Sequence, residues 1–114
     1  MTQSGPLQAF KAEFFKALAH PVRIRILEIL VAGDRSVQDL QDVLDLDQPT
    51  VSQQLAILRA KNIVTTTKVG TSVRYALRDQ LVSDLLDVAR RVFNNQLVGS
   101  QSMLRELRRE RSRR

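Results

Sequence analysis

The sequence predicts a small, mainly helical domain with one β-hairpin, an α+β fold with the element order ααααββα. Apolar residues recur at helical spacing up to Asn62, and β-branched residues then dominate two segments around Gly70. Helical spacing returns after Asp79. The 114 residues, 43% of them apolar, are enough for one modest core. We expect a flexible N-terminus at residues 1–9, one domain over residues 10–98 and a basic extension at residues 99–114.

Two helices are predicted on either side of a proline. The first is indicated by apolar residues at helical spacing: Phe10, Phe14, Phe15 and Leu18. Pro21 starts the second helix, because its fixed φ suits a first helical position. This helix is expected over Val22–Val31, with Gly33 as its stop. Its apolar residues lie nearly all round, which is typical of a central, buried helix. His20, at the junction, is expected to be structural or to cap the second helix.

Two shorter helices follow, separated by a turn at residues 45–47. Ser36 and Asp39 fit a capping-box start for the first of them. The second starts at Gln48–Pro49 and has a stripe of buried positions: Val51, Leu55 and Leu58. Two helices joined in this way form a helix-turn-helix pattern.

A hairpin and a long helix complete the domain. Ile63–Lys68 and Ser72–Leu77 flank Gly70 and predict the hairpin. Asp79 suits the N-cap of a helix that runs from Gln80 to about Gln96. That helix has two adjacent apolar rows, a stripe wider than one small domain normally buries: Leu81, Leu85, Val88 and Val92, and Val82, Leu86, Ala89 and Phe93. A last short helix is expected from Met103, Leu104 and Leu107.

The net charge of +6 is unevenly distributed. Five acidic residues against Arg35 alone lie between Asp34 and Asp47, whereas five basic residues and no acidic one lie between Arg59 and Arg78. Six arginines against two glutamates follow from position 105 onward. The basic end is either a solvated helix end or an electrostatic arm for phosphates.

Composition excludes several classes of protein. Without cysteine and with one histidine, the chain has no disulfide framework, thiolate zinc site, thiol redox sensor or histidine-rich metal site. It contains no apolar run of about 20 residues, and its start lacks the pattern of a secretory signal. We therefore expect a soluble, cytoplasmic protein without a membrane partner, metal or cofactor.

The element order is that of a winged helix-turn-helix domain, which points to DNA. The outer face of the fourth helix is small and polar, with no acidic residue from Gln48 to Lys61. Glutamine can pair bidentately with adenine, and serine or threonine can contact bases or phosphates. The candidate contacts are Gln48, Pro49, Thr50, Ser52, Gln53, Gln54 and Ala56. A basic hairpin can follow the phosphate backbone or enter the minor groove, and its candidates are Lys68, Thr71, Ser72 and Arg74.

Other functions remain as alternatives. A winged helix can serve as a protein–protein interaction module, but then the face with Ser52, Gln53 and Arg74 should be apolar. A non-specific architectural DNA binder would depend mainly on the arginine-rich end. No nucleophile–base pair, carboxylate cluster or glycine-rich phosphate loop is apparent, so we expect no enzyme and no catalytic residues.

Three segments resemble the ArsR/SmtB (arsenic-repressor) family of bacterial transcription regulators: FKALAHPVRIRILEIL at Phe15–Leu30, QPTVSQQLAILRAKNIV at Gln48–Val64 and KVGTSVRYAL at Lys68–Leu77. The resemblance covers roughly residues 10–95. It implies a homodimeric, nucleoid-associated repressor whose fourth helix lies in the major groove of an inverted repeat. Twofold symmetry predicts half-sites about one helical turn apart. The implied dimer interface is built from the first and last helices, with Phe10, Phe14, Leu81, Leu85, Val88 and Val92.

The sequence departs from the family pattern at its inducer sites. The family's Cys-x-Cys metal ligands fall at Ser36 and Gln38, neither of which replaces a thiolate. The last helix has Asp84 and Asp87 but no histidine, and an acidic edge or pairing with neighbouring arginines is expected there. Gln54 replaces a histidine often found in the family's recognition segment. Three ways of relieving repression stay open: competition with another regulator, an organic ligand bound between the dimer helices, or a change in the abundance of the protein. The operator sequence and the choice between repression and activation also stay open.

Overall fold

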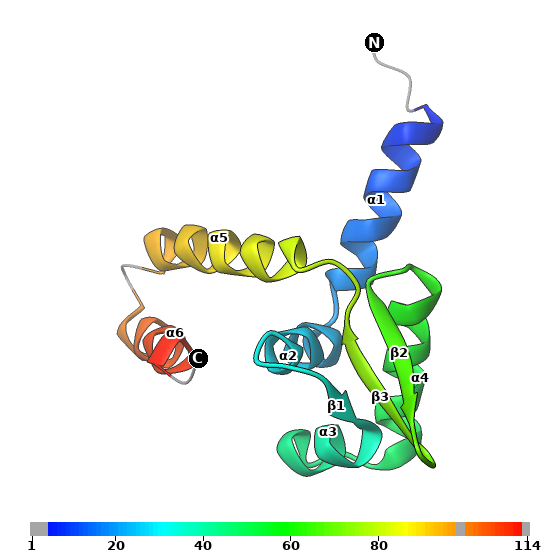
Figure 1. The fold of residues 1–114 in the computed structure, drawn as a ribbon. Helices are drawn as coiled ribbons and strands as arrows, with labels where there is room; N and C mark the ends of the chain where they lie inside the picture. Colours follow the sequence, from blue (N-terminus) through cyan, green and yellow to red (C-terminus); the bar gives the residue numbers. More distant parts are fainter. Residues whose placement is uncertain (1–4, 98–99, 113–114) are drawn as a thin grey trace. The chain divides into compact units, whose positions relative to one another are not determined.

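The computed structural model describes residues 5–97 and 100–112 and confirms a mainly helical fold with a β-hairpin (Figure 1). The helices are α1 (Pro6–Leu18), α2 (Pro21–Leu30), α3 (Val37–Leu44), α4 (Gln48–Ala60), α5 (Leu81–Gln96) and α6 (Gln101–Ser112). The strands are β1 (Arg35–Ser36), β2 (Val64–Val69) and β3 (Ser72–Leu77). The predicted order is therefore present with β1 added, and α6 contains Met103, Leu104 and Leu107, from which a last short helix was expected.

The chain divides into two compact units, one up to Asp79 and one from Gln80 onward. The domain expected over residues 10–98 spans this division. At its other end, α1 begins at Pro6, so residues 6–9 are helical rather than flexible. Pro6 suits the first helical turn, and Oε1 of Gln8 accepts a hydrogen bond from the backbone N–H of Gly5 at 3.2 Å. Residues 1–4 lie outside the described residues.

Local capping explains where three helices begin. Nδ1 of His20 accepts a hydrogen bond from the N–H of Val22 at 3.1 Å, which confirms the expected cap of α2. The capping box of α3 is also confirmed: the Ser36 hydroxyl accepts from the N–H of Asp39, and the Asp39 carboxylate accepts from the N–H of Ser36, both at 3.1 Å. For α4, Asp47 accepts a hydrogen bond from the N–H of Thr50 at 3.0 Å.

The core of the first unit lies where the helix-turn-helix meets α2 and the sheet. The predicted stripe of α4 is confirmed, because Val51, Leu55 and Leu58 are fully buried. Other fully or almost fully buried side chains come from α2, α3 and the start of the hairpin: Ile26, Leu27, Leu40, Ile63 and Val64. Burial of these aliphatic groups fixes the orientation of α4 and leaves its opposite face at the surface.

The sheet has the strand order β1-β3-β2 and is antiparallel throughout. The hairpin register pairs Val64 with Leu77 and Val69 with Ser72, which leaves a two-residue loop at Gly70–Thr71. Gly70 has a φ of 62°, a conformation that glycine adopts without a steric penalty. The short strand β1 pairs Ser36 with Arg74 and thereby joins the start of α3 to the hairpin.

The second unit consists of α5 and α6. The N-cap of α5 is Gln80 and not Asp79 as predicted, and the side chain of Gln80 makes no capping hydrogen bond. Asp87 pairs with Arg90 at 2.8 Å and with Arg91 at 3.1 Å, as expected for neighbours on one helix face. In α6, Leu104 and Leu107 are half-buried, whereas Arg105 and Arg109 are exposed. Within the described residues, no helix combines the length and apolar character that a membrane span requires.

Candidate nucleic-acid interface

The outer face of α4 gathers the predicted recognition residues on one side of the helix. Gln48, Pro49, Gln53 and Ala56 are exposed, and Thr50, Ser52 and Gln54 are half-buried at its edges. The amide nitrogen of Gln48 donates a hydrogen bond to the hydroxyl of Ser52 at 2.6 Å. No residue of α4 is acidic, so the helix itself offers polar groups without repelling a polyanion.

Asp47 places a carboxylate at the N-terminus of α4. Hydrogen bonds from the hydroxyl and the backbone N–H of Thr50 hold the pKa of Asp47 below its usual value. This carboxylate is therefore used to cap the helix and favourably opposes the positive end of the helix dipole.

The tip of the hairpin presents three of the four predicted wing residues. Lys68, Thr71 and Ser72 are exposed around Gly70, and a Cβ built at Gly70 meets nothing within 4 Å. The tip is therefore open on the side of the glycine, and Lys68 supplies a positive charge there.

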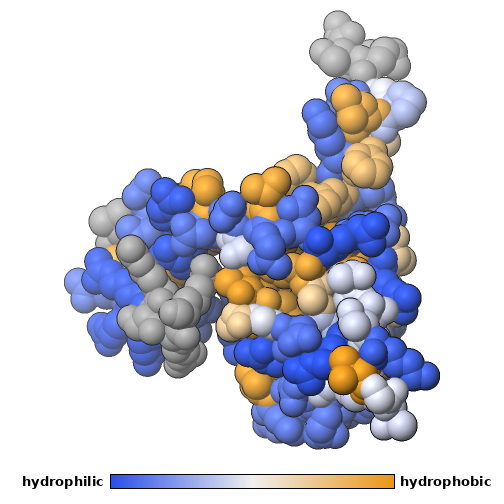
Figure 2. All heavy atoms as spheres, in the orientation of Figure 1, coloured by the Kyte–Doolittle hydropathy of each residue, from blue (hydrophilic) through white to orange (hydrophobic). Residues whose placement is uncertain are grey.

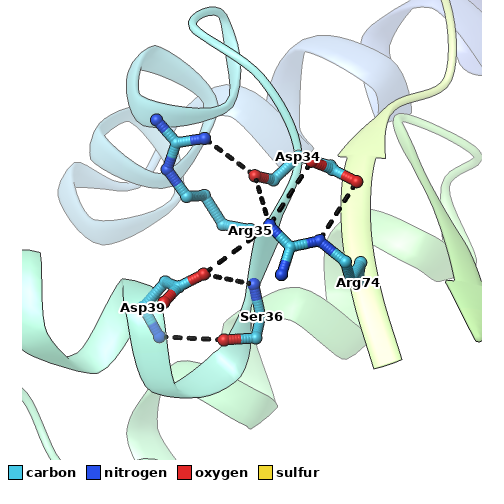
Figure 3. A network of polar contacts seen from close by, with 5 residues as sticks. All are labelled: Asp34, Arg35, Ser36, Asp39 and Arg74. Carbon is cyan, nitrogen blue, oxygen red and sulfur yellow. Dashed lines mark hydrogen bonds and ion pairs between the residues drawn. The ribbon is translucent and has the colours of Figure 1, made fainter. Parts of the chain in front are cut away.

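Arg74 lies further down the hairpin, in a polar network with the start of α3 (Figure 3). Its Nε is 3.2 Å from Oδ2 of Asp34, and its Nη2 donates to the backbone carbonyl of Asp34 at 3.2 Å. The carboxylate of Asp39 is 3.8 Å from Nη2. The hydrogen bond and charge of Asp34 raise the pKa of Arg74 further. A phosphate contact by Arg74 stays a prediction, and it would require Arg74 to exchange or share these partners.

Acidification is expected to remove the contribution of Asp39 to folding stability. The backbone N–H of Ser36, then its hydroxyl and the charge of Arg74, hold the pKa of Asp39 below its usual value. Such a carboxyl stabilises the fold fully above its unfolded pKa of about 3.9 and loses this contribution as pH falls through its folded pKa. The difference in thermal unfolding between wild type and Asp39→Asn should therefore shrink from about pH 7 to about pH 3. Asp42→Asn, exposed on the same helix, is the control, and a difference independent of pH would contradict the expectation.

The side chain of Arg23 reaches α4 from α2, a contact that sequence reasoning missed. Its Nη1 donates to Oε1 of Gln54 at 2.8 Å. The two residues are 31 positions apart, and neither periodicity nor capping patterns link positions so far apart in the sequence. Gln54 is thus the only predicted recognition residue, within the described part of the chain, that a side chain from another helix holds by a hydrogen bond.

Apolar surface lies over parts of α1 and of α5 (Figure 2), the two helices that carry the predicted dimer residues. On α1, Phe10 is 73% exposed, and the half-buried Phe14 packs edge-to-face on Phe15 with ring centroids 5.6 Å apart. On α5, Leu81, Val88 and Val92 are exposed and Leu85 is half-buried. Each helix therefore exposes large apolar side chains in a row, the arrangement expected of an association surface.

The side chains at the family's Cys-x-Cys positions make local hydrogen bonds within α3 and its cap. Ser36 belongs to the capping box of α3, and the amide of Gln38 donates a hydrogen bond to Asp42 at 2.9 Å. Within residues 5–97 and 100–112, no three metal-ligating side chains of His, Cys, Asp or Glu gather in one place.

Comparison with known proteins places this fold in a family. The profile described as "Bacterial regulatory protein, arsR family" matches residues 20–66, which run from the cap of α2 into β2. The HTH-type transcriptional regulator Rv0081 of Mycobacterium tuberculosis is 43% identical over 107 residues, 93% of this chain and 94% of that protein. The chain belongs to the ArsR family. It is accordingly a DNA-binding transcriptional regulator with a winged helix-turn-helix fold, and not an enzyme.

Solved structures and a further relative support this placement. The crystal structure of Rv0081 superposes with a TM-score of 0.77 at 45% identity and covers 82% of this chain and 95% of that one. The biofilm growth-associated repressor of Xylella fastidiosa is 35% identical over 75% of both chains. A Mycobacterium bovis domain, Mb0332, described as a homodimeric winged helix-turn-helix DNA-binding domain, has a TM-score of 0.75 at 26% identity, covering 85% of this chain and 94% of that one.

Proposed function

We propose that this ArsR-family regulator is a homodimeric repressor that binds an inverted-repeat operator on the bacterial nucleoid. In this proposal α4 enters the major groove, and the hairpin tip contacts the adjacent backbone. The observation that carries the proposal is the exposed outer face of α4, which is polar, free of acidic side chains and bordered by half-buried Thr50, Ser52 and Gln54. Such a face offers donors and acceptors to base edges at close range.

Self-association is supported by the apolar rows on α1 and α5. Phe10, Val88 and Val92 expose large apolar area to water, and burial of such area drives association. A homodimer with twofold symmetry presents two copies of α4 to DNA, so that the operator must repeat in inverted orientation. The homodimeric description of Mb0332 supports the same assembly here.

Repression is supported by the names of the relatives. The Xylella protein is described as a biofilm growth-associated repressor, and a 42%-identical M. tuberculosis relative as the repressor SmtB. The sequence contains no cysteine and only one histidine, and that histidine caps α2. We therefore propose that the regulator lacks the family's metal and thiol switches. Any inducing signal would then act at a site other than the family's metal and thiol positions.

Selection of bound DNA tests this function directly. The purified protein is incubated with fragments of its own genome and with randomised duplexes, and the enriched sequences are read. We expect an inverted repeat whose half-sites are about 10 base pairs apart from centre to centre, and repression of a reporter placed behind it. Enrichment of no common sequence despite salt-dependent binding would favour an architectural role, and absence of binding would overturn the proposal.

A further inference from the structure

Arg23 connects the end of α1 with the recognition helix α4. Its Nε donates to the carbonyl of Ala17 at 2.7 Å and its Nη2 to the carbonyl of Lys16 at 3.4 Å. These carbonyls lie in the last turn of α1, where the regular i to i+4 donors run out. The carbonyl of Lys16 also accepts a hydrogen bond from the N–H of Ala19 at 3.1 Å. The remaining terminal nitrogen, Nη1, donates to Oε1 of Gln54 at 2.8 Å. Because the guanidinium is planar and already bound on two sides, it holds the Gln54 amide in one orientation.

The chemistry of this contact determines which end of the amide faces Arg23. A guanidinium only donates hydrogen bonds, so it must meet the amide oxygen, and a flipped amide would bring donors against donors. The amide nitrogen of Gln54 then points away from Arg23. It donates no hydrogen bond to the described residues, and it is not among their buried side-chain atoms that lack a partner. It therefore reaches solvent with both of its N–H groups free.

We infer that Arg23 is a positioning residue that makes Gln54 a donor-only reader of the DNA bases. Bidentate pairing with adenine needs both the amide oxygen and the amide nitrogen of a glutamine, and Arg23 already occupies the oxygen. The free N–H groups match a base edge that presents acceptors, such as N7 and O6 of guanine or O4 of thymine. Gln54 is the central residue of α4 and lies at the edge of its outer face, next to the exposed Gln53. This inference rests on the proposed function.

The neighbouring glutamine provides an internal contrast. Gln53 is exposed and makes no side-chain hydrogen bond within the described residues, so its amide can rotate and use both ends. The two adjacent glutamines of α4 are thus expected to read different base edges. Helical periodicity alone places the two glutamines on neighbouring faces of α4. The contact with Arg23 adds that Gln54 offers only its N–H groups, whereas Gln53 offers both its amide oxygen and its N–H groups.

The test measures base preference at every position of the selected operator. Gln54→Ala should relax one position per half-site, which locates the contacted base. At that position wild type should disfavour adenine, and Arg23→Ala should reduce this discrimination about tenfold, since the freed amide can turn toward adenine. In the Gln54→Ala background, Arg23→Ala should change base preference no further. A purely structural role of Arg23 would not produce this dependence on Gln54.

Controls separate the possible failures. Arg25→Ala removes another arginine of α2, which pairs with Glu28, and should leave base preference unchanged. Arg23→Lys replaces Arg23→Ala if the latter unfolds, because a lysine cannot span both Ala17 and Gln54. The inference is overturned if Arg23 variants leave base preference unchanged, if their effect persists without Gln54, or if Gln54→Ala weakens all DNA sequences equally, as a phosphate contact would. Failure of wild type to select any sequence would instead contradict the proposed function.

Discussion

Replacing Leu85 and Val92 together by glutamate is expected to convert the dimer into monomers and to abolish operator binding at concentrations that saturate wild type. Both residues belong to the apolar row of α5, and Val92 is 46% exposed in the single chain. In a dimer formed through this row, each copy would bury two carboxylates without partners, which costs several kcal/mol. Sedimentation equilibrium measures the mass, and circular dichroism confirms that the helices remain.

A matched surface change tests whether added charge alone causes dissociation. Val43 on α3 is 55% exposed and lies outside the proposed interface. Val43→Glu should therefore remain dimeric at the same protein concentration. If the Leu85→Glu, Val92→Glu variant is still a dimer, the association surface lies elsewhere on the chain.

Gln53→Ala is expected to cost about 1–3 kcal/mol of operator affinity and to relax base preference at one position per half-site. Gln53 is exposed on the outer face of α4, so its truncation should leave the unfolding temperature unchanged. Competition of operator variants in a binding assay measures both effects. Gln38→Ala, which truncates an exposed glutamine on α3, should leave affinity unchanged, and an unchanged affinity of Gln53→Ala would mean that another face of α4 reads the DNA.

The parts of the fold that depend on neighbouring residues could be predicted from the sequence. The cap at His20, the box of Ser36 with Asp39 and the buried stripe of α4 all follow from interactions over two to seven positions. The hairpin was predicted one residue early, since Ile63 is buried before the strand begins. The outer face of α4 follows directly from its buried stripe, because a helix has fixed periodicity.

Contacts between distant positions could not be predicted. The two-residue strand β1 is too short to produce a periodic pattern, yet it brings Arg74 to Asp34, which is 40 positions away. On the sequence alone, Arg74 was therefore expected to be a positive charge of the hairpin that is available to DNA. The hydrogen bond between Arg23 and Gln54 likewise depends on how α2 crosses α4. For the same reason the division after Asp79 was not predicted, since apolar patterning marks helices and not the contacts between them.

The open conformation at Gly70 has a consequence for chirality. Its φ is 62°, and a Cβ added there would meet nothing within 4 Å. A side chain at this position is therefore disfavoured by the backbone conformation and not by crowding. An L-residue is strained at this positive φ, whereas a D-residue favours it. A chain assembled by chemical ligation could carry a D-amino acid at position 70 with a photoreactive or fluorescent group. A reporter mounted at the hairpin tip in this way would test the proposed contact between the tip and DNA.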